Sequence, residues 1–231
     1  MGRRGTAVAR ESADLVLLED NITSLVDALA LGRRIEANLH RALGYTLAIH
    51  LPIATLTALP LVIAGQPPLL QPLHIALLHL VIDPACTVVF EAIPATAAQM
   101  RRPPRSPDAP LFGVATWRQA LWQGGSLTAA ALLLSHWPGL GTAMHRSLLF
   151  ALLLIAAGGL VWLNGEPRHR LTQLGAAIGV ALWVLLQTIP GLPALLQLVP
   201  LDRPAFGVLL PVLLALAALA VIARLARKPR A

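Results

Sequence analysis

Long apolar runs alternate with short polar connections over most of the chain. After residue 42 we expect six of these runs, near residues 43–64, 73–93, 115–136, 145–163, 171–189 and 205–225. A helix of about 20 residues is long enough to cross ~30 Å of hydrocarbon. The pattern therefore predicts an all-α polytopic membrane protein with six transmembrane helices.

The first 42 residues follow a different and more polar pattern. Residues 15–18 form a short apolar run suited to one buried strand. Apolar positions between 22 and 29 recur at helical spacing, which predicts a helix that begins near Asp20 and continues into the first span. One strand and one helix bury too little surface to form a core of their own. We therefore interpret this segment as the edge of a larger domain.

The composition and the placement of charge agree with a membrane protein. Hydrophobic residues make up 56% of the chain and charged residues 13%, and the net charge is +7. Of the 18 basic residues, 16 lie before the first span, at or beyond the end of the last span, or in and next to the even-numbered connections, and the two exceptions are Arg146 and Arg203. The positive-inside rule then predicts an integral membrane protein with both termini in the cytoplasm, and we expect a bacterial plasma membrane. The expected contacts of these residues are membrane lipid and cytoplasmic domains, not nucleic acid.

An acidic residue stands near the middle of the second predicted span. Asp83 lies in the apolar stretch LHLVIDPACT, and His79 precedes it by four residues, so both side chains project from one helix face. An ionised carboxylate at that depth costs ~2.5–3.5 kcal/mol. It must face a partner, a cavity or a bound cation, or else take up a proton.

Prolines stand beside the ionisable residues of the first two spans. Proline has no N–H, so Pro84 leaves the carbonyl of Leu80 without its usual donor, and Pro52, close to His50, does the same to Ala48. Transporters build cation sites from interrupted helices with such carbonyls. The candidate cation-binding groups are Asp83, His79, His50 and the carbonyls of Ala48 and Leu80, with Pro52 and Pro84 as helix-breaking residues and the first three as possible metal ligands.

Simpler interpretations remain open for each of these residues. Either proline can serve only helix packing. A histidine inside a bundle can hydrogen-bond a neighbouring helix instead of an ion. Asp83 can be neutralised by His79 or His50 as an internal pair. The last four spans carry almost no intramembrane charge, so their expected role is that of a scaffold.

Several motifs in residues 1–113 resemble P-type cation-transporting ATPases, most closely the calcium-pump-like branch. They are Gly5-Thr6-Ala7-Val8-Ala9-Arg10, Asp14-Leu15-Val16-Leu17, Asp20-Asn21, Gly32-Arg33-Arg34-Ile35 with Asn38, Val81-Ile82-Asp83-Pro84-Ala85, Arg102-Pro103-Pro104-Arg105 and Pro110-Leu111-Phe112. The resemblance implies that residues 1–42 are the edge of the phosphorylation domain and the stalk helix. Residues 43–100 would then be two ion-site helices, 101–114 a cytoplasmic loop, and 115–231 a four-helix scaffold with a basic tail.

The resemblance also implies a cation ligand and exposes departures from the family pattern. Asp83 matches an acid that binds the ion in this family. Where calcium pumps carry Asn, Glu, Asn and Thr, this chain has His50, Ile53, His79 and Ile82. Calcium prefers six to eight oxygen ligands, so the transported cation stays open between calcium and another divalent ion, or a proton-linked site.

The family's Asp-Lys-Thr-Gly-Thr phosphorylation motif does not occur in the sequence. We therefore expect the transport half of a pump, with ATP and magnesium acting on a missing N-terminal half and no ATP hydrolysis by this chain alone. One alternative is a non-catalytic remnant or partner subunit that transports nothing by itself. Another is an unrelated six-span channel or secondary transporter, in which residues 1–42 would have no role.

Overall fold

The computed structural model describes residues 2–226 except 4, 64–67, 102, 104–105, 107–109 and 111–112, and this part is helical. The elements, in chain order, are α1 (Ala7–Glu11), α2 (Thr23–Val62), α3 (Pro72–Pro84), the π-helix η1 (Ala85–Phe90), α4 (Ala97–Met100), α5 (Val114–Ser135), α6 (Thr142–Asn164), α7 (Arg170–Thr188), α8 (Leu192–Leu195) and α9 (Arg203–Ala226).

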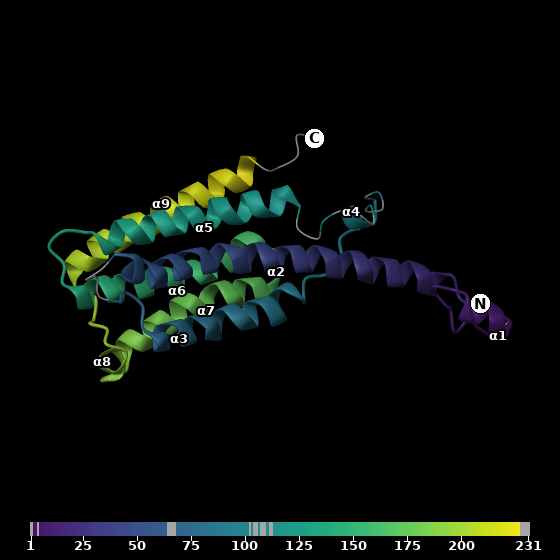
Figure 1. The fold of residues 1–231 in the computed structure, drawn as a ribbon, viewed down its shortest axis with the longest axis horizontal. Coiled ribbons are helices and arrows are strands. Elements are labelled where there is room, and N and C mark those ends of the chain that lie inside the picture. Colours follow the sequence, from purple (N-terminus) through teal and green to yellow (C-terminus); the bar gives the residue numbers. More distant parts are fainter. Residues whose placement is uncertain are drawn as a thin grey trace.

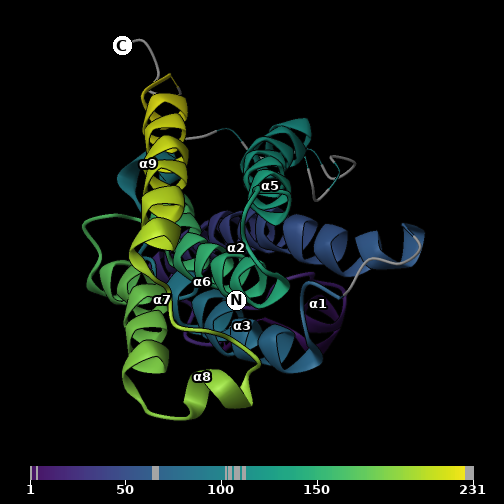
Figure 2. The ribbon, with the colours of Figure 1, turned by 90° about the vertical axis from the view of Figure 1, so that its left-hand side faces the viewer.

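The long helices form an elongated bundle around α6 (Figures 1 and 2). Residues 148–154 of α6 are at most 1% exposed, so this helix is covered on all sides. A helix that is apolar all round is typical of such a central position. By contrast, α9 lies at the outside of the bundle and keeps most of its apolar surface exposed.

The helix α2 extends well beyond the bundle and carries the N-terminus at its far end (Figure 1). It is continuous over 40 residues, with Pro52 and Pro60 inside it. The prediction that a helix starting near Asp20 runs straight into the first span is therefore confirmed. The proposed domain boundary at residue 42 falls within this one helix, and that boundary remains a prediction.

The predicted strand at residues 15–18 is wrong, because no strand forms in the described part of the chain. A backbone hydrogen bond joins the Gly2 N–H to the Leu17 carbonyl at 2.8 Å, but it does not extend into a ladder. Leu15 and Leu18 are more than half exposed. A strand needs a neighbour along its whole length, and these residues have none in the described structure.

Five of the described helices are long and apolar enough to cross a membrane: Thr23–Val62, Pro72–Phe90, Thr142–Asn164, Arg170–Thr188 and Arg203–Arg224. Judged by helix length and composition, the structure therefore supports five transmembrane helices and not the six that we predicted. The helix α5 is present close to the predicted 115–136, but Arg118, Gln119 and Gln123 make it more polar than the others.

Two predicted basic regions lie largely outside the described residues. One is the connection with Arg102 and Arg105, within the predicted loop 101–114. The other is the tail with Arg227, Lys228 and Arg230.

Candidate functional site

The first pair of predicted site residues lies on the last two turns of α3. The Nδ1 atom of His79 is 3.4 Å from Oδ1 of Asp83, as the spacing of four residues requires. The side chain of Asp83 is 72% exposed and that of His79 is 38% exposed. The carboxylate thus stands on the outer surface of the helix bundle, and the imidazole lies between it and α2.

The structure brings His50 of α2 to the same place. Its ring meets the ring of His79 edge to face, with 5.3 Å between the ring centroids. The Nδ1 atom of His50 lies 2.8 Å from the Thr46 carbonyl oxygen. Because a carbonyl oxygen can only accept, Nδ1 carries the proton of this hydrogen bond and donates it. That bond leaves Nε2 as the ring nitrogen that can accept a proton or bind an ion. His50, His79 and Asp83 therefore form a continuous row of polar side chains across α2 and α3.

The helix does not end at Pro84 but changes its hydrogen bonding there. α3 passes directly into the π-helix η1, and the Ala85 N–H donates to the carbonyls of both Val81 and Ile82. The hydroxyl of Thr87 donates to the Asp83 carbonyl at 3.0 Å. π-helical turns are rare and occur frequently at functional sites. The sequence shows the proline but not the π-helix that follows it.

The two predicted backbone carbonyls lie in different surroundings. Ala48 is fully buried, and its carbonyl oxygen lies against α5, 2.7 Å from the position that a Cβ at Gly124 would take. Leu80 is 61% exposed on the outer face of α3. A cation-binding role for either carbonyl stays a prediction.

The interpretation from sequence missed three neighbours of this site. The Thr46 hydroxyl and the Cys86 thiol are 3.3 Å apart and join α2 to η1. Tyr45 packs against Phe90, with 5.4 Å between ring centroids, and its buried hydroxyl has no hydrogen-bond partner in the described structure. The spacing of four residues between Thr46 and His50 is the signal that could have found Thr46.

The site is not a closed metal centre within the residues that the structure describes. No group of three or more His, Cys, Asp or Glu side chains there could hold a metal ion. The geometry instead offers one carboxylate and two imidazoles along an exposed face. Such a face can contribute ligands to a cation only if further donors approach it from outside the described structure.

Comparison with known proteins places most of this structure in one family. Residues 67–228 match the family described as "Cation transporting ATPase, C-terminus". The chain belongs to this family, as a C-terminal portion of a P-type cation ATPase. The matched range contains α3, η1 and the helices from α4 to α9, and so includes His79 and Asp83, whereas His50 precedes it.

Individual relatives point in the same direction. The chain is 29% identical to "Calcium-transporting ATPase 2" of Schizosaccharomyces pombe over 60% of its own length and 11% of the relative. It is 32% identical to "Calcium-transporting ATPase 7, plasma membrane-type" of Oryza sativa subsp. japonica, over 59% of the chain and 13% of the relative. It is also 30% identical to "Probable cation-transporting ATPase F" of Mycobacterium bovis, over 64% of the chain and 16% of the relative. The chain thus spans less than a fifth of these proteins.

Proposed function

We propose that this chain forms the cation path of a P-type ATPase, with Asp83 as the ion ligand and His79 and His50 beside it. The observation that carries the proposal is the exposed Asp83 carboxylate inside the apolar helical stretch Pro72–Phe90. A charge in such a stretch is costly and marks a functional site by default. The π-helix that begins two residues later supports the same function.

The exposed face of α3 and η1 needs a cover in the membrane. Leu80, Asp83, Thr87 and Val88 are exposed together along it. We propose that membrane helices from another part of a longer pump, or from a partner chain, pack against this face and complete the ligand set. The same additional part would bind ATP and magnesium and hydrolyse ATP, because this sequence lacks the phosphorylation motif.

We propose that α5 crosses the membrane as a sixth span. Its polar side chains are paired within the bundle: Gln119 donates to Asn164 Oδ1 at 2.6 Å, and Asn164 donates to Gln123 Oε1 at 3.1 Å. Paired amides inside a bundle are tolerated in lipid. Six crossings, together with the basic connections, put both termini in the cytoplasm and the apolar helices in contact with membrane lipid.

The transported cation in this proposal is divalent, with calcium as the first candidate. Two of the relatives described above are named as calcium-transporting. Calcium binds six to eight oxygens, and the site here supplies one carboxylate with two imidazoles. Imidazole also suits softer divalent ions, so zinc and manganese belong in the same test.

A second candidate function is that of a non-catalytic remnant or partner subunit. The observation in its favour is that the described residues hold no closed metal cluster. In that case the Asp83–His79 pair would serve only to attach the chain to other membrane helices.

Transport by a reconstituted pump separates the two functions. The full chain would be co-expressed with an N-terminal P-type ATPase half that carries the phosphorylation motif, and ATP-driven uptake into vesicles would be measured for calcium, zinc, manganese and protons. We expect uptake of one divalent cation that needs both parts. ATP-driven uptake of none of them, from a complex that assembles, would contradict the transport function and favour the subunit function.

A further inference from the structure

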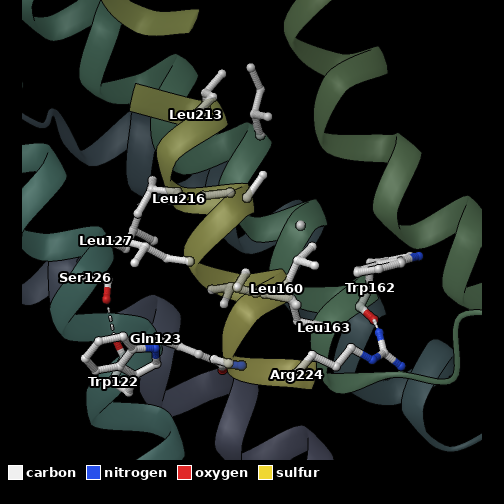
Figure 3. Close-up of a pocket in the computed structure, with 18 of the residues that line it drawn as sticks. Trp122, Gln123, Ser126, Leu127, Leu160, Trp162, Leu163, Leu213, Leu216 and Arg224 are labelled. Carbon is white, nitrogen blue, oxygen red and sulfur yellow. Dashed lines mark hydrogen bonds between the residues drawn. The ribbon is translucent and has the colours of Figure 1, made fainter. Parts of the chain in front are cut away.

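A half-open apolar cleft lies between α5, α6 and α9, away from the Asp83 site. Its volume is about 390 Å³, and leucine, alanine and other aliphatic side chains of α6 and α9 line most of it. Figure 3 shows Arg224 and Trp162 at one end of the cleft and Leu213 toward the other. The cleft therefore has a long apolar body and one cationic end.

The polar side chains in the cleft body already have partners. The Ser126 hydroxyl donates to the Trp122 carbonyl at 2.7 Å (dashed in Figure 3). The Gln123 side-chain oxygen accepts from Asn164 at 3.1 Å. An occupant of the body would consequently meet aliphatic surface, so it must itself be apolar there.

Arg224 supplies a positive charge that no carboxylate among the described residues neutralises. Its guanidinium lies over the Trp162 ring, 4.8 Å from the centroid, and one Nη1–H points at the Trp162 carbonyl at 3.4 Å. Within the part of the chain that the structure describes, no carboxylate forms an ion pair with Arg224. The charge of Arg224 is therefore available to an anion at the mouth of the cleft.

The tryptophans indicate the depth at which that anion would lie. Trp122 and Trp162 both line the cleft at the end where Arg224 lies, with Trp162 beside Arg224 and Trp122 across the cleft from it. Tryptophan is enriched at the level of lipid headgroups, and arginine in the last turn of a membrane helix extends to the same level. The mouth of the cleft thus lies at the height of the lipid phosphates, and its body reaches into the acyl-chain region.

We propose that the cleft between α5, α6 and α9 binds an anionic phospholipid, with one acyl chain in the cleft and the headgroup phosphate against the Arg224 guanidinium. The single cationic end supports a phospholipid over a partner helix, because a phospholipid brings a phosphate to the level of Arg224 together with an acyl chain for the apolar body. This lipid site is separate from the cation path and does not depend on it.

Native mass spectrometry of the detergent-solubilised full chain tests the headgroup contact. The chain would be titrated with phosphatidylglycerol and phosphatidylcholine carrying the same acyl chains. We expect one tightly held phosphatidylglycerol, and Arg224→Gln should weaken its binding roughly fivefold. The same variant should weaken phosphatidylcholine less, because the choline ammonium already offsets the phosphate charge. Arg170→Gln, which removes an exposed arginine outside the cleft, is the matched control. An equal loss in both variants, or no loss in either, overturns the proposal.

A second pair of variants tests the acyl-chain contact without changing charge. Gly159 lines the cleft, and a Cβ added there meets no atom within 4 Å, so Gly159→Leu should fill the cleft and leave the fold intact. Gly125→Leu, equally free of close atoms but outside the cleft, is the control. We expect Gly159→Leu alone to abolish the tightly held lipid.

Unchanged lipid binding in Gly159→Leu would place the lipid elsewhere and overturn the proposal. Inorganic phosphate added alone distinguishes a lipid headgroup from a free anion. It should not displace the bound phosphatidylglycerol, and displacement would show that Arg224 binds phosphate without the acyl chain.

Discussion

At the scale of single residues, Gly124 sets how closely α5 approaches α2. A Cβ at this position would lie 2.7 Å from the Ala48 carbonyl oxygen and 3.1 Å from the Ala48 Cα. Both are backbone atoms of a buried residue, so they cannot move aside as a flexible side chain would. Small residues at such crossings are how membrane helices reach close packing.

We therefore predict that Gly124→Val lowers the free energy of unfolding of the chain by about 1–3 kcal/mol, the range typical of overpacking. Thermal unfolding of the purified chain in detergent measures this. Gly125→Val makes the same change where a Cβ meets no atom within 4 Å, so its stability should stay near that of the parent chain. Equal destabilisation by both variants would mean that helix propensity, and not the α2–α5 contact, causes the effect.

The buried Asn164 shows why the sequence of α5 alone does not reveal whether this helix can cross the membrane. Its amide bonds to Gln119 and Gln123, which are 45 and 41 residues away along the chain. The hydropathy of α5 is too low for a transmembrane helix when the helix is taken alone. The Asn164 side chain, which pairs with its Gln119 and Gln123 amides and so allows them to lie in lipid, comes next to them only in the folded structure.

At the scale of elements, the sequence predicted correctly the helices whose apolar residues recur at helical spacing. The helix from Thr23 into the first span follows from apolar residues at helical spacing, and it is present as α2. The strand at residues 15–18 failed because a strand needs neighbours. The π-helix η1 could not be predicted either, because Pro84 indicates a lost hydrogen bond but not the i→i+5 hydrogen bonds of the turn that follows it.

The connection after η1 is held by the N-terminal half of α2. The buried Asn38 side chain donates to the carbonyls of Glu91 at 3.2 Å and Ile93 at 2.9 Å. One turn earlier, Arg33 donates to the carbonyls of Gln99 and Met100 at 2.6 and 2.9 Å. These contacts link the long helix α2 to the end of the helix that carries Asp83, so a movement of α2 would be transmitted to it.

Asn38→Leu should loosen this connection, because it leaves the Glu91 and Ile93 carbonyls without their donor. Each buried carbonyl left without a donor costs about 1–3 kcal/mol of stability. We expect hydrogen exchange of a peptide covering residues 91–101 to accelerate about tenfold or more, while the rest of α3 changes little. Leu39→Ala, one residue further along on the more exposed side of α2, is the control. Unchanged exchange in Asn38→Leu would show that Asn38 does not hold the connection.

At the scale of the whole molecule, the question is how many helices cross the membrane. Six crossings put residue 12 and residue 166 on one side and residue 143 on the other. If α5 does not cross, residue 143 lies on the same side as residue 12. The location of residue 143 therefore decides between five and six spans.

Single cysteines in a Cys86→Ala background give this answer, because Cys86 is the one native cysteine. We predict that cysteines replacing Ser12 and Glu166 react with a membrane-impermeant maleimide from the cytoplasmic side, and that one replacing Ala143 reacts from the opposite side. Labelling of the Ala143 position from the cytoplasmic side would contradict the sixth span.

The measurement that tests the central claim most directly is cation transport by the reconstituted pump with Asp83→Asn. This substitution keeps size and hydrogen bonding while removing the charge that we assign to the ion. We predict that cation-dependent transport falls to background while the chain still inserts and assembles. Glu91→Gln removes a carboxylate at the end of η1 and should retain transport. Transport unchanged in Asp83→Asn would contradict the account.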